Sequence, residues 1–146
     1  GFNYRITDFQ CALGISQLAK LDKFVNRRKE IAATYDEKFK SSDLISPLYR
    51  FDFDSSYHLY IAMIDFEKAG VDRKELFARL NGKKIYPQVH YIPINMQPYY
   101  RGLGYDPYDT PKALEYYRRC ISLPIYPDLT DDLQDYVLSC LFGALK

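Results

Sequence analysis

The C-terminal stretch of the chain carries its clearest amphipathic pattern. Its apolar residues recur at i, i+3, i+4, i+7 and i+8, the spacing of one face of an α-helix; they are Leu133, Tyr136, Val137, Cys140 and Leu141. Thr130 precedes this stretch as a suitable N-cap, and the acidic residues at 131 and 132 favour the first turn of a helix. The pattern therefore predicts a helix that packs one face against the rest of the chain.

Two further helices are predicted near the start of the chain. Thr7 and Gln10 fit a capping box, which predicts a helix over about residues 8–22. Gly14 inside it costs about 1 kcal/mol relative to alanine, so we interpret it as a point of close approach by another element. A second helix over about 23–40 has an apolar stripe formed by Phe24, Ile31, Tyr35 and Phe39. Its charged residues are interpreted as a solvated outer face: Arg27, Arg28, Lys29, Glu30, Glu37 and Lys38.

The remainder alternates between strand and helix signals. Strands are predicted over 57–64 and 85–94, the second limited to a sheet edge by Pro87 and Pro93, and a short extended segment over 123–127. Helices are predicted over about 72–81, started by Asp72, and after Thr110. Residues 41–47 are interpreted as a linker and 95–109 as a loop. The order of these elements predicts an α+β fold, a small sheet covered by helices.

Composition excludes several classes of protein. The chain has 146 residues, the size of one domain, and its net charge of +1 gives no footprint for nucleic acid or an anionic membrane. No apolar run reaches the ~18–20 residues that span a bilayer. Three widely spaced cysteines without a CxxC pattern are interpreted as buried, reduced thiols of a cytosolic protein. The two histidines, His58 and His90, have no neighbouring ligand pattern, so no metal site is predicted.

Four blocks of sequence, in order along the chain, resemble the DegT/StrS family of sugar-nucleotide aminotransferases, which use pyridoxal phosphate (PLP). The first is residues 1–18, which are similar to the family's G-x-N-x-R-x-[ST]-[DE]-x-Q block. The others are the V-H-Y-x-P element at 89–93, the P-Y-Y and L-G-Y loop at 98–105, and the S-L-P-I-Y-P-x-L-T signature at 122–130. The H-Y-I-P and P-Y-Y runs are most similar to enzymes that act at C4 of a UDP-linked 4-keto-6-deoxy amino sugar.

The resemblance implies roles for five residues. Asn3 matches an asparagine that donates its amide to the PLP phosphate across the family's dimer interface, and Arg5 matches a nearby charged clamp. His90, Tyr91 and Tyr99 match positions that line the pocket for the nucleotide-sugar. The residues alone favour simpler interpretations: Asn3 as a turn residue, Arg5 as a surface charge, and His90 as a packed or hydrogen-bonded core histidine.

The resemblance also implies an architecture. Residues 1–22 match the end of the large PLP-binding domain, and 23–146 match the small C-terminal domain of a fold type I aminotransferase, with helices packed on a short, mostly antiparallel sheet. The family's cofactor lysine lies upstream of the first block, and nothing precedes Gly1 in this sequence. We therefore expect no catalytic residue in this chain and no activity from it alone. The implied complete enzyme is a cytoplasmic homodimer that moves an amino group from a donor such as glutamate to a 4-keto sugar nucleotide for cell-surface polysaccharide or glycan synthesis.

Two alternatives remain at the level of sequence. The chain could be a stand-alone, non-catalytic remnant that binds a sugar nucleotide or a protein partner. It could also be an RNA-binding module that stacks bases on its tyrosines, but such a module needs a basic groove. The net charge of +1 and the proline-interrupted segment at 85–94 disfavour the RNA-binding alternative.

Overall fold

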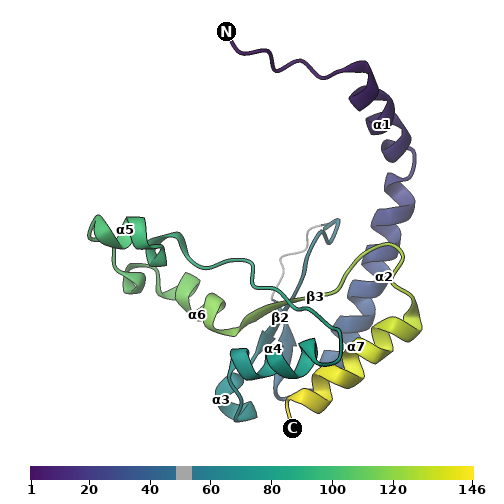
Figure 1. Ribbon diagram of the computed structural model, residues 1–146. Helices are drawn as coiled ribbons and strands as arrows, with labels where there is room; N and C mark the ends of the chain where they lie inside the picture. The colour runs from purple at the N-terminus through teal and green to yellow at the C-terminus, as the bar shows by residue number, and fades with distance from the viewer. Residues whose placement is uncertain (49–53) are drawn as a thin grey trace.

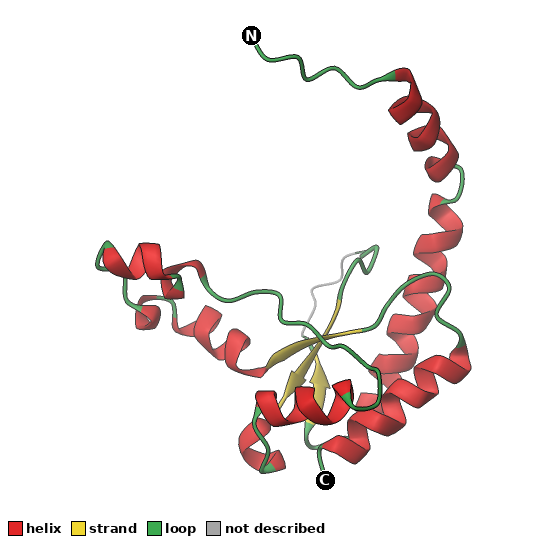
Figure 2. Ribbon diagram, in the orientation of Figure 1, coloured by secondary structure: helices red, strands yellow, loops and turns green. Residues whose placement is uncertain are grey.

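A computed structural model describes residues 1–48 and 54–146 of the chain (Figures 1 and 2). The α-helices are α1 Asp8–Leu18, α2 Leu21–Phe39, α3 Phe66–Ala69, α4 Arg73–Asn81, α5 Pro98–Gly102, α6 Pro111–Arg119 and α7 Asp131–Ala144. The strands are β1 Ile45–Pro47, β2 Tyr60–Ile64 and β3 Cys120–Leu123, and two short 3-10 helices are η1 Ile94–Met96 and η2 Pro107–Asp109. The predicted α+β class is confirmed.

The three strands form an antiparallel sheet in the order β1-β2-β3. Tyr60 of β2 pairs with Leu123 of β3, and Ile64 pairs with Ile45 of β1. Among the residues that the structure describes, the far edge of β3 is met at one point only, where Gln88 forms an isolated bridge with Ser122. The sheet therefore continues past β3 for a single residue, and this residue leads directly to His90.

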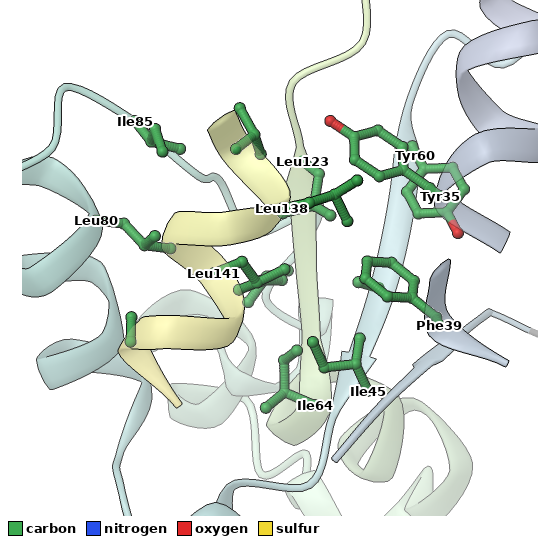
Figure 3. Packing of buried hydrophobic residues seen from close by; sticks show 14 of the residues in the cluster. Tyr35, Phe39, Ile45, Tyr60, Ile64, Leu80, Ile85, Leu123, Leu138 and Leu141 are labelled. Atoms are coloured by element: carbon green, nitrogen blue, oxygen red, sulfur yellow. The ribbon is translucent and has the colours of Figure 1, made fainter. Parts of the chain in front are cut away.

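The hydrophobic core lies where α2, α4 and α7 meet this sheet. Tyr35 of α2 packs against Tyr60 with ring centroids 4.7 Å apart, and both rings are buried. Figure 3 shows these rings beside Leu138 of α7, with Leu80 and Ile85 on the other side of that helix. Two side chains of the core bond to backbone carbonyls: the Tyr35 hydroxyl donates to the Pro124 carbonyl at 2.9 Å, and the buried Gln134 amide donates to the Ile31 carbonyl at 2.8 Å.

Two parts of the chain extend away from the core (Figure 1). At the N-terminus, residues 1–7 and α1 continue outward from the end of α2, and no residue of α1 is buried. On another side, α5 and α6 form a projecting arm that returns to the sheet at β3. None of the described helices is long and apolar enough to cross a membrane.

Several sequence predictions are wrong at the strands. The interpretation of 41–47 as a linker missed β1, which is recognisable only through its pairing with β2. The strand predicted over 57–64 begins at Tyr60, since Tyr57 adopts a positive φ of 48° that interrupts extended backbone. The strand predicted over 85–94 is reduced to the Gln88 bridge, because Pro87 and Pro93 lack the N–H that a ladder needs. The extended segment predicted over 123–127 overlaps the observed strand β3 only at Leu123, where β3 ends.

The helices differ in smaller ways. The first helix ends at Leu18, and the predicted loop at 95–109 contains α5 and η2, each with a proline in its first turn. The buried face of α7 is rotated from the predicted stripe, so that Leu133 and Tyr136 are about half exposed. Its buried residues are Gln134, Val137, Leu138, Leu141 and Ala144.

Two arginines on the charged face of α2 bond to other segments of the chain. Arg27 donates to the Leu129 carbonyl at 2.6 Å and to Asp131 at 2.7 Å. Arg28 donates to the carbonyls of Ile125 at 2.9 Å and Tyr57 at 3.3 Å. These bonds fix the segment that joins β3 to α7 against α2, so the prediction of a purely solvated face is wrong for these two arginines.

Two predictions of burial also need correction. Outside the neighbouring residues and backbone of its own helix, no described atom lies within 4 Å of a Cβ placed on Gly14, so no other described element approaches that glycine. Of the three free cysteines, Cys120 is buried, whereas Cys11 and Cys140 are partly exposed.

Candidate functional site

The first candidate site is the extended segment before α1. Asn3 Oδ1 accepts hydrogen bonds from the Arg5 backbone N–H at 3.3 Å and from Arg5 Nε at 3.2 Å. The capping box follows directly: Thr7 Oγ1 accepts from the Gln10 N–H at 3.3 Å, and Gln10 Oε1 accepts from the Thr7 N–H at 2.9 Å. The two predicted cofactor residues therefore contact each other, and they lie directly before the capped N-terminus of α1.

The chemistry of this pair fits a phosphate group. Because both bonds use the oxygen of Asn3, its amide nitrogen keeps two N–H donors, and the Arg5 guanidinium adds charged donors beside it. Both side chains are exposed, so within the described chain no other element closes around them. The phosphate of PLP would need further walls from outside residues 1–48 and 54–146.

The second candidate site is the turn at His90 and Tyr91, just beyond the Gln88 bridge. His90 Nδ1 lies 2.7 Å from Ser122 Oγ on β3. The Tyr116 hydroxyl at the end of α6 donates to the His90 carbonyl at 2.6 Å. The Tyr91 ring stands edge-on to the His90 ring, with centroids 4.6 Å apart, and is 70% exposed. His90 is thus held from two sides while its neighbour is presented outward.

The hydroxyl that holds this turn stays protonated. Burial is the main cause that raises the pKa of Tyr116 to about 12, with the neighbouring Cys120 thiol contributing. At neutral pH the Tyr116 phenol is therefore a hydrogen-bond donor to the His90 carbonyl.

The third candidate site is the tyrosine-rich arm. Tyr99 stands edge-on to Tyr100, which in turn contacts Tyr105. Asn95 closes the base of the arm, because its amide donates to the Asp106 carbonyl and to Thr110 Oγ1, both at 2.9 Å. A hollow of about 370 Å³ at this base is lined by Pro93, Ile94, Asn95, Tyr100, Tyr105, Thr110 and Ala113. Tyr99 itself is 72% exposed on the outside of the arm.

The structure groups the predicted residues into separate clusters. Asn3 and Arg5 lie together, as do His90 and Tyr91, but the N-terminal segment and the arm lie at opposite ends of an open arc (Figure 1). Sequence reasoning missed Ser122, Tyr116 and Asn95. Ser122 lies inside the fourth sequence block, but only the fold places it against His90. Among the described residues, no cluster of histidine, cysteine and carboxylate side chains could hold a metal ion.

Comparison with known proteins gives consistent matches. The model of the DegT/DnrJ/EryC1/StrS aminotransferase family matches residues 1–142. The spore coat polysaccharide biosynthesis protein SpsC of Bacillus subtilis is 39% identical over all of this chain and 38% of its own length. The UDP-4-amino-4,6-dideoxy-N-acetyl-beta-L-altrosamine transaminase of Campylobacter jejuni is 34% identical, again over the whole chain and 39% of its own length.

Solved structures agree with these relatives. Helicobacter pylori PseC, an aminotransferase involved in the biosynthesis of pseudoaminic acid, superimposes with a TM-score of 0.89 at 31% identity, over 99% of this chain and 39% of PseC. Streptococcus pneumoniae Spr1654, solved in a PLP form, gives a TM-score of 0.85 at 31% identity, over 97% and 36% of the two chains. The chain thus spans well under half the length of the proteins that it matches.

Proposed function

Because the chain belongs to the DegT/DnrJ/EryC1/StrS aminotransferase family, we propose that it is the C-terminal portion of a PLP-dependent sugar-nucleotide aminotransferase. The complete enzyme takes an amino group from an amino acid such as glutamate and transfers it to a 4-keto sugar nucleotide. The observation that carries this proposal is the match to PseC over 99% of the chain. The name of the Campylobacter relative, a transaminase of a UDP-4-amino-4,6-dideoxy sugar, supports C4 as the site of transfer.

The N-terminal segment serves the cofactor in this proposal. PLP, when bound, supplies the electron-withdrawing ring that amino transfer needs. Residues 1–22 belong to the large domain, and α1 supports this assignment because its apolar side chains Phe9, Leu13 and Leu18 are all more than half exposed. The Asn3 amide and the Arg5 guanidinium bind the PLP phosphate in the active site of a partner subunit, which makes the enzyme a homodimer.

The small domain, residues 23–146, serves the sugar nucleotide. His90, Tyr91 and Tyr99 line the side of the cleft that receives it, and the arm presents its exposed tyrosine rings there. Tyrosine suits this task because its ring offers apolar contact and its hydroxyl offers a hydrogen bond. Nucleotide sugars and PLP enzymes meet in the cytoplasm, where we place this protein, and its product enters polysaccharide or glycan synthesis.

The test is amino transfer by the complete enzyme that contains this segment. We expect glutamate and a UDP-linked 4-keto-6-deoxy amino sugar to give a UDP-linked 4-amino sugar and 2-oxoglutarate, detected by mass spectrometry in equal amounts. A matched reaction with pyruvate in place of the keto sugar is the control for general transamination. Amino transfer to pyruvate without transfer to any nucleotide-linked keto sugar would contradict the proposal.

A further inference from the structure

We propose that Ser122 is a positioning residue that fixes His90 as an Nε2–H donor toward an oxygen atom of the sugar nucleotide, and that Tyr116 holds the same turn through its backbone. This inference rests on the proposed function, because it assumes that His90 faces the substrate. It adds a protonation form for that histidine and two residues that set its orientation.

Ser122 is rigidly placed. It is one of two buried polar residues among the described residues, with 5% of its surface exposed, and it lies within β3, where every residue is buried. Its N–H donates to the Gln88 carbonyl at 2.7 Å, and its carbonyl accepts from the Gln88 N–H at 3.2 Å. The backbone that carries His90 is therefore anchored to the same residue that contacts its ring.

The burial of this hydroxyl sets the direction of the hydrogen bond. A buried O–H is expected to donate its hydrogen, because a buried donor without an acceptor destabilises the folded state. In the part of the chain that the structure describes, the one hydrogen bond of Ser122 Oγ is the 2.7 Å contact with His90 Nδ1. Nδ1 must then accept, and an accepting nitrogen carries no proton in the neutral ring. The ring proton is consequently on Nε2.

The same bond sets where Nε2 points. The two nitrogens of an imidazole lie on opposite edges of the ring, so a ring held at Nδ1 by buried Ser122 directs Nε2 away from β3. His90 is only partly buried and its neighbour Tyr91 is exposed, so this direction leads outward. The Tyr116 hydroxyl at the His90 carbonyl, 2.6 Å away, keeps the turn from rotating.

The consequence for recognition is specific. A ring fixed in this form offers one hydrogen-bond donor and no acceptor, so it selects an oxygen on the ligand. Both a diphosphate oxygen and a sugar or base carbonyl of the nucleotide sugar have this chemistry. UDP alone as an inhibitor separates a contact with the nucleotide from a contact with the sugar, because UDP retains the diphosphate and base but lacks the sugar.

The tautomer is measured directly, without reference to activity. The measurement is a long-range proton–nitrogen spectrum of the ¹⁵N-histidine-labelled chain at about pH 8, above the ordinary histidine pKa of ~6.5. The chain contains only two histidines, so comparison with a His58→Asn variant assigns the signals of His90. We expect His90 to carry its proton on Nε2, and the Nδ1 resonance to shift in Ser122→Ala. Ser139→Ala, which removes the hydroxyl of an exposed serine on α7, is the matched control, in which Nδ1 stays unchanged. A wild-type spectrum with the proton on Nδ1 overturns the inference.

The kinetic arm uses the complete enzyme. We expect Ser122→Ala to raise the Michaelis constant for the sugar nucleotide about fivefold, the scale of one hydrogen bond, with the amino-donor half-reaction unchanged and Ser122→Thr restoring affinity. An equal rise in the inhibition constant of UDP assigns the contact to the nucleotide, and no rise assigns it to the sugar. If His90→Ala weakens binding of the sugar nucleotide and Ser122→Ala does not, the positioning role of Ser122 is overturned. If neither variant changes substrate affinity, His90 is outside the substrate site and the proposed role of His90 itself fails.

Discussion

The first and last helices of the chain start alike and end in different surroundings. Thr7 caps α1 and Thr130 caps α7, each accepting a hydrogen bond at 3.3 Å from the N–H three residues later. Yet α7 buries five residues against the sheet and α4, whereas α1 buries none. Local capping starts a helix, but burial of apolar surface stabilises it. The apolar side chains of α1 are therefore suited to a surface outside the described residues, while those of α7 build the core.

The largest expected effect is a loss of stability when a buried residue of α7 is truncated. Leu141 of α7 is fully buried, so Leu141→Ala leaves a cavity and should lower the free energy of unfolding by about 2–5 kcal/mol. Leu13 of α1 is 54% exposed, so the matched Leu13→Ala should change it by less than about 0.5 kcal/mol. Urea denaturation of the three chains measures both values. Equal losses in the two variants would mean that α1 is packed as firmly as α7.

The next effect concerns the outer side of the comparison. Asn3 is exposed, and its side chain bonds to the neighbouring Arg5 on the same exposed segment, so Asn3→Ala should leave the stability of this chain unchanged. In the complete enzyme the same variant should weaken PLP retention by about 1–3 kcal/mol, because a buried phosphate contact loses its donor. PLP release followed by absorbance measures it. Unchanged PLP affinity would make Asn3 a turn residue.

A smaller effect tests the core at high pH. Burial is the main cause that raises the pKa of Tyr35 far above its ordinary value near 10. Since the unfolded chain ionises first, the contribution of Tyr35 is complete below about pH 10 and is lost as pH rises toward its folded pKa, by about 1.4 kcal/mol per pH unit. Tyr35→Phe should remove this part of the alkaline loss while costing about 1 kcal/mol at neutral pH through the hydrogen bond to Pro124. Denaturation curves at pH 8 and pH 11 compare the two proteins, and identical alkaline slopes would contradict the burial of this phenol.

The helical starts could be predicted from sequence because their signals are local. The capping box at Thr7 and the side-chain caps at Asp72 and Thr130 each use a bond to a residue three positions away, and all three are confirmed. The strands were harder, because a three-residue strand such as β1 is defined by its partner rather than by its own residues. The prolines at 87 and 93 were read correctly as limits on pairing, but only the fold shows that a single bridge remains.

The candidate sites divide in the same way. The resemblance to the family named Asn3, Arg5, His90 and Tyr91, and the structure brings these into two contacting pairs. It could not name Ser122 or Tyr116, because they lie 32 and 26 residues from His90 and meet it only when α6 and β3 are in place. The prediction of a solvated face at Arg27 and Arg28 was wrong for the same reason. Arg27 donates to the Leu129 carbonyl and Arg28 to the Ile125 carbonyl, and each acceptor lies about 100 residues away along the chain.

The central claim is that the exposed N-terminal segment serves the cofactor and that the His90 turn serves the substrate. The most direct measurement is the rate of each half-reaction of the complete enzyme, with glutamate and with the keto sugar nucleotide, in Asn3→Ala, His90→Ala and the control His58→Ala, which alters the other histidine of the chain. We predict that Asn3→Ala slows both half-reactions, that His90→Ala slows only the sugar half-reaction, and that His58→Ala slows neither. Loss of both half-reactions in His90→Ala, or of neither in Asn3→Ala, would contradict this division.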